Sequence, residues 1–83
     1  MNKVLIEVIV PVANVKYDVY IPLESKVAEI ATLLANAMSD LSNHNYMPGE
    51  VVTMCNYKSG KEYDKNLYCF ETDIENGTQI VIL

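Results

Sequence analysis

A single stretch of this 83-residue chain has the period of an amphipathic helix. Its apolar residues recur at every third or fourth position, and polar residues occupy the opposite face. Ser25 is preferred over Glu24 as the N-cap, and the polar run at residues 42–45 is expected to end the helix. Because a chain this short has room for one core, every other segment must pack against the apolar stripe. The stripe comprises Val27, Ile30, Ala31, Leu34, Met38 and Leu41.

The residues before the helix have the pattern of two β-strands. Residues 3–10 are largely aliphatic or β-branched, which is typical of a strand buried on one face and partly covered on the other. Pro11 cannot donate a ladder hydrogen bond, so the pairing should break there and the chain should reverse. Residues 15–21 then alternate apolar and polar side chains until Pro22 ends the strand. In this second strand, Val15, Tyr17, Val19 and Ile21 are expected to face the core.

The residues after the helix predict two full strands and a short one between them. Residues 51–57 form the third strand, and a turn at residues 58–61 leads into a short fourth strand at residues 62–63. A turn at residues 76–77 introduces the last strand, residues 78–83. The long connection before that turn carries three isolated apolar anchors, Leu67, Phe70 and Ile74.

This order of elements predicts one domain over residues 1–83. A strand pair, one helix, a second strand pair, a long connection and a last strand together form an α+β fold of the β-grasp type. We expect a mixed sheet of four to five strands packed on one helix. The core should then lie between the helix stripe and the apolar faces of the first, second and last strands.

The charge of the chain argues against several classes of partner. The chain has eleven acidic residues, six lysines and no arginine, which gives a net charge of −5. A nucleic acid or an anionic membrane would require the opposite balance. No apolar run reaches the roughly 20 residues of a membrane span, so no direct membrane insertion is expected. The first residues resemble a signal peptide, but Glu7 and Pro11 interrupt the apolar run, which favours a folded strand.

The reactive side chains are few. Cys55 and Cys69 are interpreted as two reduced thiols, although the sequence leaves a disulfide open. His44 is the only histidine, and it is interpreted as an exposed loop residue rather than the partner of a nucleophilic cysteine. The three glycines stand alone in turns, so no phosphate-binding loop is present. We therefore expect no catalytic residue, no cofactor and no metal ligand.

Two segments and the helix between them carry a family resemblance. Residues 17–22 read YDVYIP, and residues 73–83 read DIENGTQIVIL. Together they resemble the small ubiquitin-like proteins of bacterial type VII secretion loci, the YukD/EsaB family. The resemblance implies a cytoplasmic ubiquitin-like β-grasp protein that accompanies or regulates a membrane-embedded secretion machine through protein partners, without catalysis. The connections at residues 45–50 and 64–73 depart from the family pattern, so we expect their structure and the choice of partner to differ from those of the family.

The last residues bear on a second possible function of such a fold. Conjugating and sulfur-carrying β-grasp proteins react through a flexible tail that ends in two glycines. Here residues 80–83 are all strand formers, and Gly77 lies six residues before the last one. Activation of the last carboxylate would require the central strand to leave the sheet. A covalent modifier or sulfur carrier is therefore disfavoured against a non-covalent binding protein.

The face of the sheet opposite the helix is the expected binding surface. The two-residue period of a strand places Leu5, Ile9, Tyr20 and Val81 on that face. In the third strand, either residues 52, 54 and 56 or residues 51, 53, 55 and 57 point outward. We prefer the first set, because alignment with the helix-facing core places Thr53 and Cys55 inside. The predicted protein-binding patch is Leu5, Ile9, Tyr20, Met54 and Val81.

The preferred function is therefore a non-catalytic adaptor or regulatory protein associated with a type VII-like secretion system. It would act by non-covalent protein binding through the open sheet face. The alternative is a homo-oligomeric structural module that uses the same patch or a sheet edge.

Overall fold

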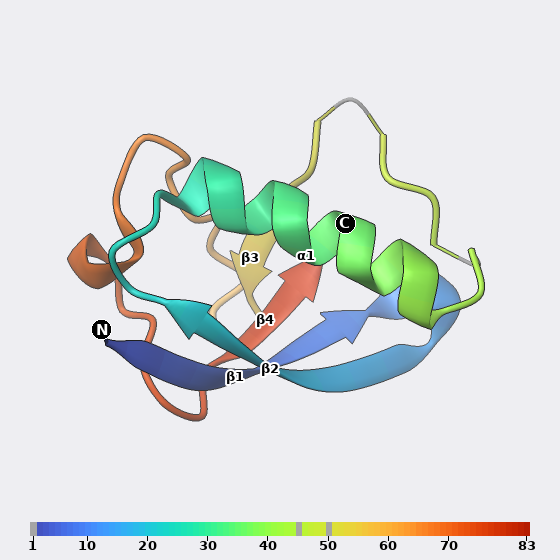
Figure 1. Ribbon diagram of the computed structural model, residues 1–83, viewed down its shortest axis with the longest axis horizontal. Helices are drawn as coiled ribbons and strands as arrows, with labels where there is room; N and C mark the ends of the chain where they lie inside the picture. The colour runs from blue at the N-terminus through green and yellow to red at the C-terminus, as the bar shows by residue number, and fades with distance from the viewer. Residues whose placement is uncertain (1, 45, 50) are drawn as a thin grey trace.

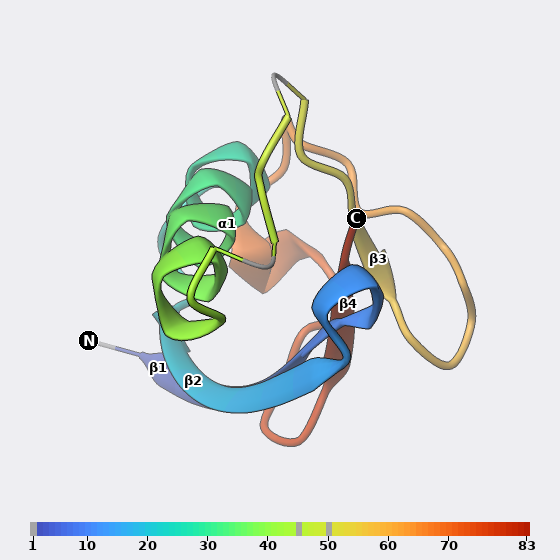
Figure 2. The ribbon, with the colours of Figure 1, turned by 90° about the vertical axis from the view of Figure 1, so that its right-hand side faces the viewer.

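One helix crosses one face of a four-stranded sheet in the computed structural model, which describes residues 2–44, 46–49 and 51–83 (Figure 1). Two short 3-10 helices lie in the connections, η1 (Pro11–Ala13) and η2 (Cys69–Glu71). Figure 2 shows α1 over the half of the sheet that β1 and β2 form. The main elements are β1 (Lys3–Val10), β2 (Val15–Pro22), α1 (Val27–Leu41), β3 (Met54–Asn56) and β4 (Gln79–Ile82).

The sheet has the mixed topology of the β-grasp fold. Its strand order is β2-β1-β4-β3, in which β1 and β4 run parallel and the two outer pairs run antiparallel. The α+β prediction is confirmed, with four strands. The predicted short strand at residues 62–63 is reduced to an isolated bridge between Cys55 and Glu62. The ladder goes no further because the chain turns away at Asp64, where Asn66 N–H donates to Asp64 Oδ1 at 2.9 Å and Leu67 N–H donates to Asp64 O at 3.2 Å.

The helix covers the predicted apolar stripe, from Val27 to Leu41, but its N-cap differs from the prediction. Lys26 occupies the N-cap position without a side-chain cap, so the preference for Ser25 is wrong. The long connection satisfies the first backbone donors of the helix instead: Val27 N–H donates to Leu67 O at 2.9 Å and Ala28 N–H donates to Lys65 O at 3.3 Å. A tertiary contact thus replaces the local cap that the sequence suggested.

The core lies between α1 and the sheet, as the stripe predicts, except that Leu41 at the end of the helix is 52% exposed. The even-numbered residues of β1 are buried beneath the helix together with Ile80 and Ile82 of β4. Of the three predicted anchors, Ile74 is buried and Leu67 is half-buried, but Phe70 is 61% exposed. Phe70 stacks on Tyr68 at the surface, with 5.4 Å between the ring centroids. The predicted loose connection at residues 45–50 includes Asn45 and Glu50, which lie outside the described residues.

Gly77 has a conformation that other residues adopt with difficulty. Its φ is +87°, and its N–H donates to Leu5 O at 2.8 Å, which ties the turn before β4 to β1. A Cβ at this position would meet no atom within 4 Å, so the cost of a side chain is conformational rather than steric. We expect Gly77→Ala to lower the free energy of unfolding by about 1–2 kcal/mol. Urea unfolding measures this change, and an unchanged midpoint would contradict it.

Candidate protein-binding site

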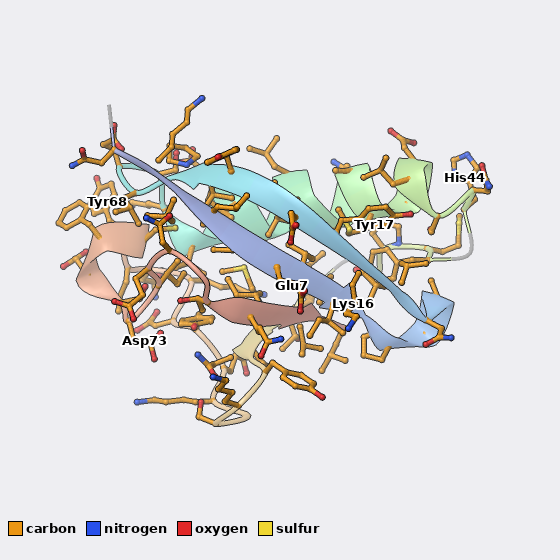
Figure 3. The ribbon with its side chains drawn as sticks, turned by 90° about the horizontal axis from the view of Figure 1, so that it is seen from below. Glu7, Lys16, Tyr17, His44, Tyr68 and Asp73 are labelled. Carbon is orange, nitrogen blue, oxygen red and sulfur yellow. The ribbon has the colours of Figure 1, made fainter. Side chains whose placement is uncertain are left out.

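Among the described residues, no element covers the face of the sheet opposite α1, and this face carries most of the predicted patch. In β1 the odd residues Leu5, Glu7 and Ile9 are half-buried on this face, whereas the even residues are buried under the helix. Figure 3 looks onto this face, with Glu7 and Lys16 toward the viewer and α1 behind the sheet. We call the surface the open face.

Strand register arranges the open face in three rows. Tyr20 and Leu5 are paired at one end, and Gly77 N–H bonds to Leu5 beside them. A polar row follows, in which Gln79 Nε2 donates to Glu7 Oε1 at 2.8 Å. The row at the other end is mainly apolar and contains Lys16, Ile9, Val81 and Cys55. A polar belt therefore separates two apolar ends.

Four of the five predicted patch residues lie on the open face. Leu5, Ile9 and Val81 are half-buried there, and Tyr20 is 66% exposed.

The fifth predicted patch residue, Met54, does not lie on the open face. Met54 is 1% exposed and packs in the core, so its predicted outward orientation is wrong. The register of β3 explains this: Met54 pairs with Ile82 and Cys55 pairs with Val81, and paired residues share a face. Because Ile82 is buried, Met54 must be buried too. Cys55 replaces it on the open face, as the alternative orientation of the third strand predicts.

A shallow hollow lies at the Tyr20 end of the open face. Lys58 brings a positive charge to its edge, while Glu7 and Asp18 bring negative charges. Leu5 N–H donates to Asn76 Oδ1 at 2.8 Å, which holds one wall of the hollow against β1. The hollow therefore combines an apolar floor with charges of both signs, a composition that suits a protein surface. Its lining includes Leu5, Glu7, Asp18, Tyr20, Lys58 and Gln79.

The reactive side chains are not brought together. Cys55 and Cys69 are free thiols, and burial raises the pKa of both, with the Glu62 carboxylate raising that of Cys55 further. His44 lies beyond the end of α1, with Nδ1 at 3.2 Å from Ser39 Oγ. Figure 3 places His44 and Tyr68 at opposite ends of the molecule, and Cys69 directly follows Tyr68. Cys69 and His44 therefore do not form a nucleophile and base.

Among residues 2–44, 46–49 and 51–83, no group of three or more His, Cys, Asp or Glu side chains is placed to hold a metal ion. In the same ranges, no helix combines the length and the apolar character needed to cross a membrane.

The sequence matches no family model and no curated protein. The structure has many solved neighbours. A chain of the MycP5-free ESX-5 inner membrane complex is similar at a TM-score of 0.79 with 18% identity, covering 100% of this chain and 21% of that one. The ubiquitin-like domain of the Mycobacterium tuberculosis type VII secretion system protein EccD1 is similar at a TM-score of 0.67 with 9% identity, covering 100% and 99%. The chain has the ubiquitin-like fold.

This ubiquitin-like fold also occurs in other settings. A chain of the toluene 4-monooxygenase HD complex with 4-bromobenzoate is similar at a TM-score of 0.81 with 13% identity, covering 98% of this chain and 96% of that one. All three identities are low, so the likeness establishes the fold alone. This ubiquitin-like chain spans about a fifth of the ESX-5 chain that it matches.

Proposed function

We propose that this ubiquitin-like chain is a non-catalytic adaptor or regulatory protein of a type VII-like secretion system in the cytoplasm, and that its open face binds a protein component of that system. The observation that carries the proposal is the open face itself. It offers apolar side chains at both ends and a polar belt between them, without a covering element among the described residues. Such a mixture of apolar and polar groups suits a protein interface.

Two independent observations support the secretion assignment. The sequence resembles the YukD/EsaB family in the segments 17–22 and 73–83, and two structural neighbours come from an ESX-5 membrane complex and a type VII secretion protein. The fold alone would not separate secretion from other roles, because the monooxygenase neighbour has the same fold. Agreement between sequence and structure is what favours secretion.

A charge introduced on the open face should weaken partner binding without unfolding the protein. We expect Leu5→Glu and Val81→Glu to lower recovery of secretion components about tenfold or more, because each puts an unpaired charge into an apolar end of the interface. The measurement is quantitative mass spectrometry of proteins that co-purify with the tagged full chain from detergent-solubilised host membranes. Thr32→Glu, at an exposed position of α1, is the matched control.

Cys55 supplies a second measurement in the same experiment. It is half-buried on the open face, whereas Cys69 is fully buried, so a bound partner should slow alkylation of Cys55 and leave Cys69 unchanged. Circular dichroism and urea unfolding show whether each variant is folded. Unchanged recovery with folded Leu5→Glu would refute the open face as the interface. Recovery of oxygenase subunits in place of secretion components would refute the secretion assignment.

A further inference from the structure

The β2 strand forms an open edge of the sheet, at a different site from the open face. It is the first strand in the order β2-β1-β4-β3 and spans Val15–Pro22. Among the described residues, only β1 pairs with it. The other edge strand, β3, has three residues, and the bridge to Glu62 protects it. An exposed edge of eight residues is a template for another extended chain.

The register identifies the unpaired backbone groups of β2. Leu5 and Glu7 bond toward the β4 side: Gly77 N–H donates to Leu5 O, and Glu7 N–H donates to Thr78 O. In β1, the even residues must therefore bond to β2, because successive residues of a strand bond to opposite sides. Their partners are the odd residues of β2, which are Val15, Tyr17, Val19 and Ile21. The N–H and C=O groups of Lys16, Asp18 and Tyr20 consequently point away from the sheet.

An apolar groove runs along the same edge, between β2 and α1. Leu33 is 63% exposed on its helix side, and Val19 and Ala37 are half-buried within it. Tyr17 closes one end, because its hydroxyl donates to Leu41 O at 2.8 Å. Figure 2 shows β2 curving beneath α1 along this side of the molecule. The groove is lined mainly by Val19, Ile21, Ile30, Leu33, Leu34 and Ala37.

The rim of the groove is acidic. Glu29 precedes Leu33 by one helical turn, and Asp40 follows Ala37 by about one turn, so both lie along the helix side of the groove. Both are exposed, whereas the Asp18 side chain lies on the open face. Lys16 is the one basic residue of β2, and the chain as a whole has a net charge of −5. The charge of the rim therefore favours lysine or arginine in a bound segment.

We propose that the β2 edge and its groove bind an extended segment of a partner protein by strand addition. The segment carries aliphatic residues at alternate positions, whose side chains enter the groove, and lysine or arginine at its flanks, which meet the acidic rim. Its backbone pairs with Lys16, Asp18 and Tyr20. A second copy of this chain fits less well, because it would set the same acidic rim against itself.

A synthetic peptide tests the proposal on the full chain. The probe alternates valine and threonine between pairs of lysines, and it is titrated into labelled protein with amide hydrogen exchange followed by nuclear magnetic resonance. We expect binding to slow exchange of the Lys16, Asp18 and Tyr20 amides, whereas the Tyr17 and Val19 amides are already protected by β1. Leu33→Asp should weaken binding about tenfold or more, because it places a charge in the apolar groove. Thr32→Asp, at the adjacent exposed position of the helix, should leave the affinity unchanged.

Two altered peptides test the backbone pairing and the charge preference without a protein variant. N-methylation of alternate amides removes the peptide's pairing groups and should abolish binding, and glutamate in place of lysine should weaken it. Failure of the lysine peptide to bind, equal binding of the N-methylated peptide, or protection confined to open-face amides would overturn the proposal. Protection of the edge amides that grows with protein concentration in the absence of peptide would also overturn it, since a second copy would then occupy the edge.

Discussion

Replacing Met54 by lysine is expected to unfold the protein, whereas Cys55→Lys should leave it folded. Met54 is 1% exposed beneath the helix layer, and it pairs with buried Ile82. A charge buried there has no partner and costs several kcal/mol, out of the roughly 5–15 kcal/mol that stabilise a typical domain. Cys55 lies on the open face, where the lysine stem can extend along the sheet while its ammonium stays in water.

Alanine substitutions at the same two positions should give a measurable difference in the free energy of unfolding. Met54→Ala should lower the free energy of unfolding by about 2–5 kcal/mol, because it leaves a cavity in a packed core. Cys55→Ala should change it far less. Urea unfolding followed by circular dichroism measures both variants under one condition. A larger loss for Cys55→Ala than for Met54→Ala would mean that β3 faces the opposite way.

The orientation of a strand could be predicted from the sequence only where apolar and polar residues alternate along it. In β2 the apolar and polar residues alternate, so the inward face could be predicted from the period alone. Residues 51–57 read VVTMCNY and lack such alternation, so both orientations of the third strand remained possible. Only pairing with β4 decides between them, and that pairing is a long-range contact.

The helix illustrates the same division between local and tertiary information. Its apolar stripe fixed the bounds of α1 correctly, because helical periodicity is a local property. Its N-cap was predicted wrongly, because the carbonyls of Leu67 and Lys65 accept the first N–H groups. These carbonyls belong to the connection over residues 64–73, whose path the sequence did not predict. The open edge at β2 could not be predicted either, since the order of the strands in a sheet follows from topology and not from the alternation of apolar and polar residues.

Tyr63 joins that connection to the β3 turn. Its hydroxyl donates to Asp73 Oδ1 at 2.8 Å and accepts from Asn56 Nδ2 at 3.0 Å. The side chain is 7% exposed. Because the connection also supplies the first hydrogen bonds of α1, this hydroxyl links β3 to the segment that starts the helix. We expect Tyr63→Phe to lower the free energy of unfolding by about 1–3 kcal/mol near neutral pH, since Asn56 and Asp73 then lose their shared partner.

The pH dependence of stability provides an independent test of this link. Burial, together with the hydrogen bond and charge of Asp73, raises the pKa of Tyr63 to about 12, against the lowering effect of Asn56. Below the ordinary tyrosine pKa of 10.0, the hydroxyl is protonated in both folded and unfolded chains, and its contribution is fully present. Between these two values the unfolded chain releases the proton more readily, so stability falls as pH rises, by up to about 1.4 kcal/mol per pH unit from this group.

Comparison with Tyr63→Phe isolates the contribution of this hydroxyl to the pH dependence of stability, because the two proteins differ in no other group. Urea unfolding at several pH values up to about 12 should show a steeper loss for the wild-type protein. The stability difference between the two proteins should therefore narrow as pH rises. A constant difference across that range would show that the hydroxyl is not held in the protonated form by its burial and by Asp73. The link between β3 and the connection would then have to rest on packing of the ring rather than on the hydrogen bonds.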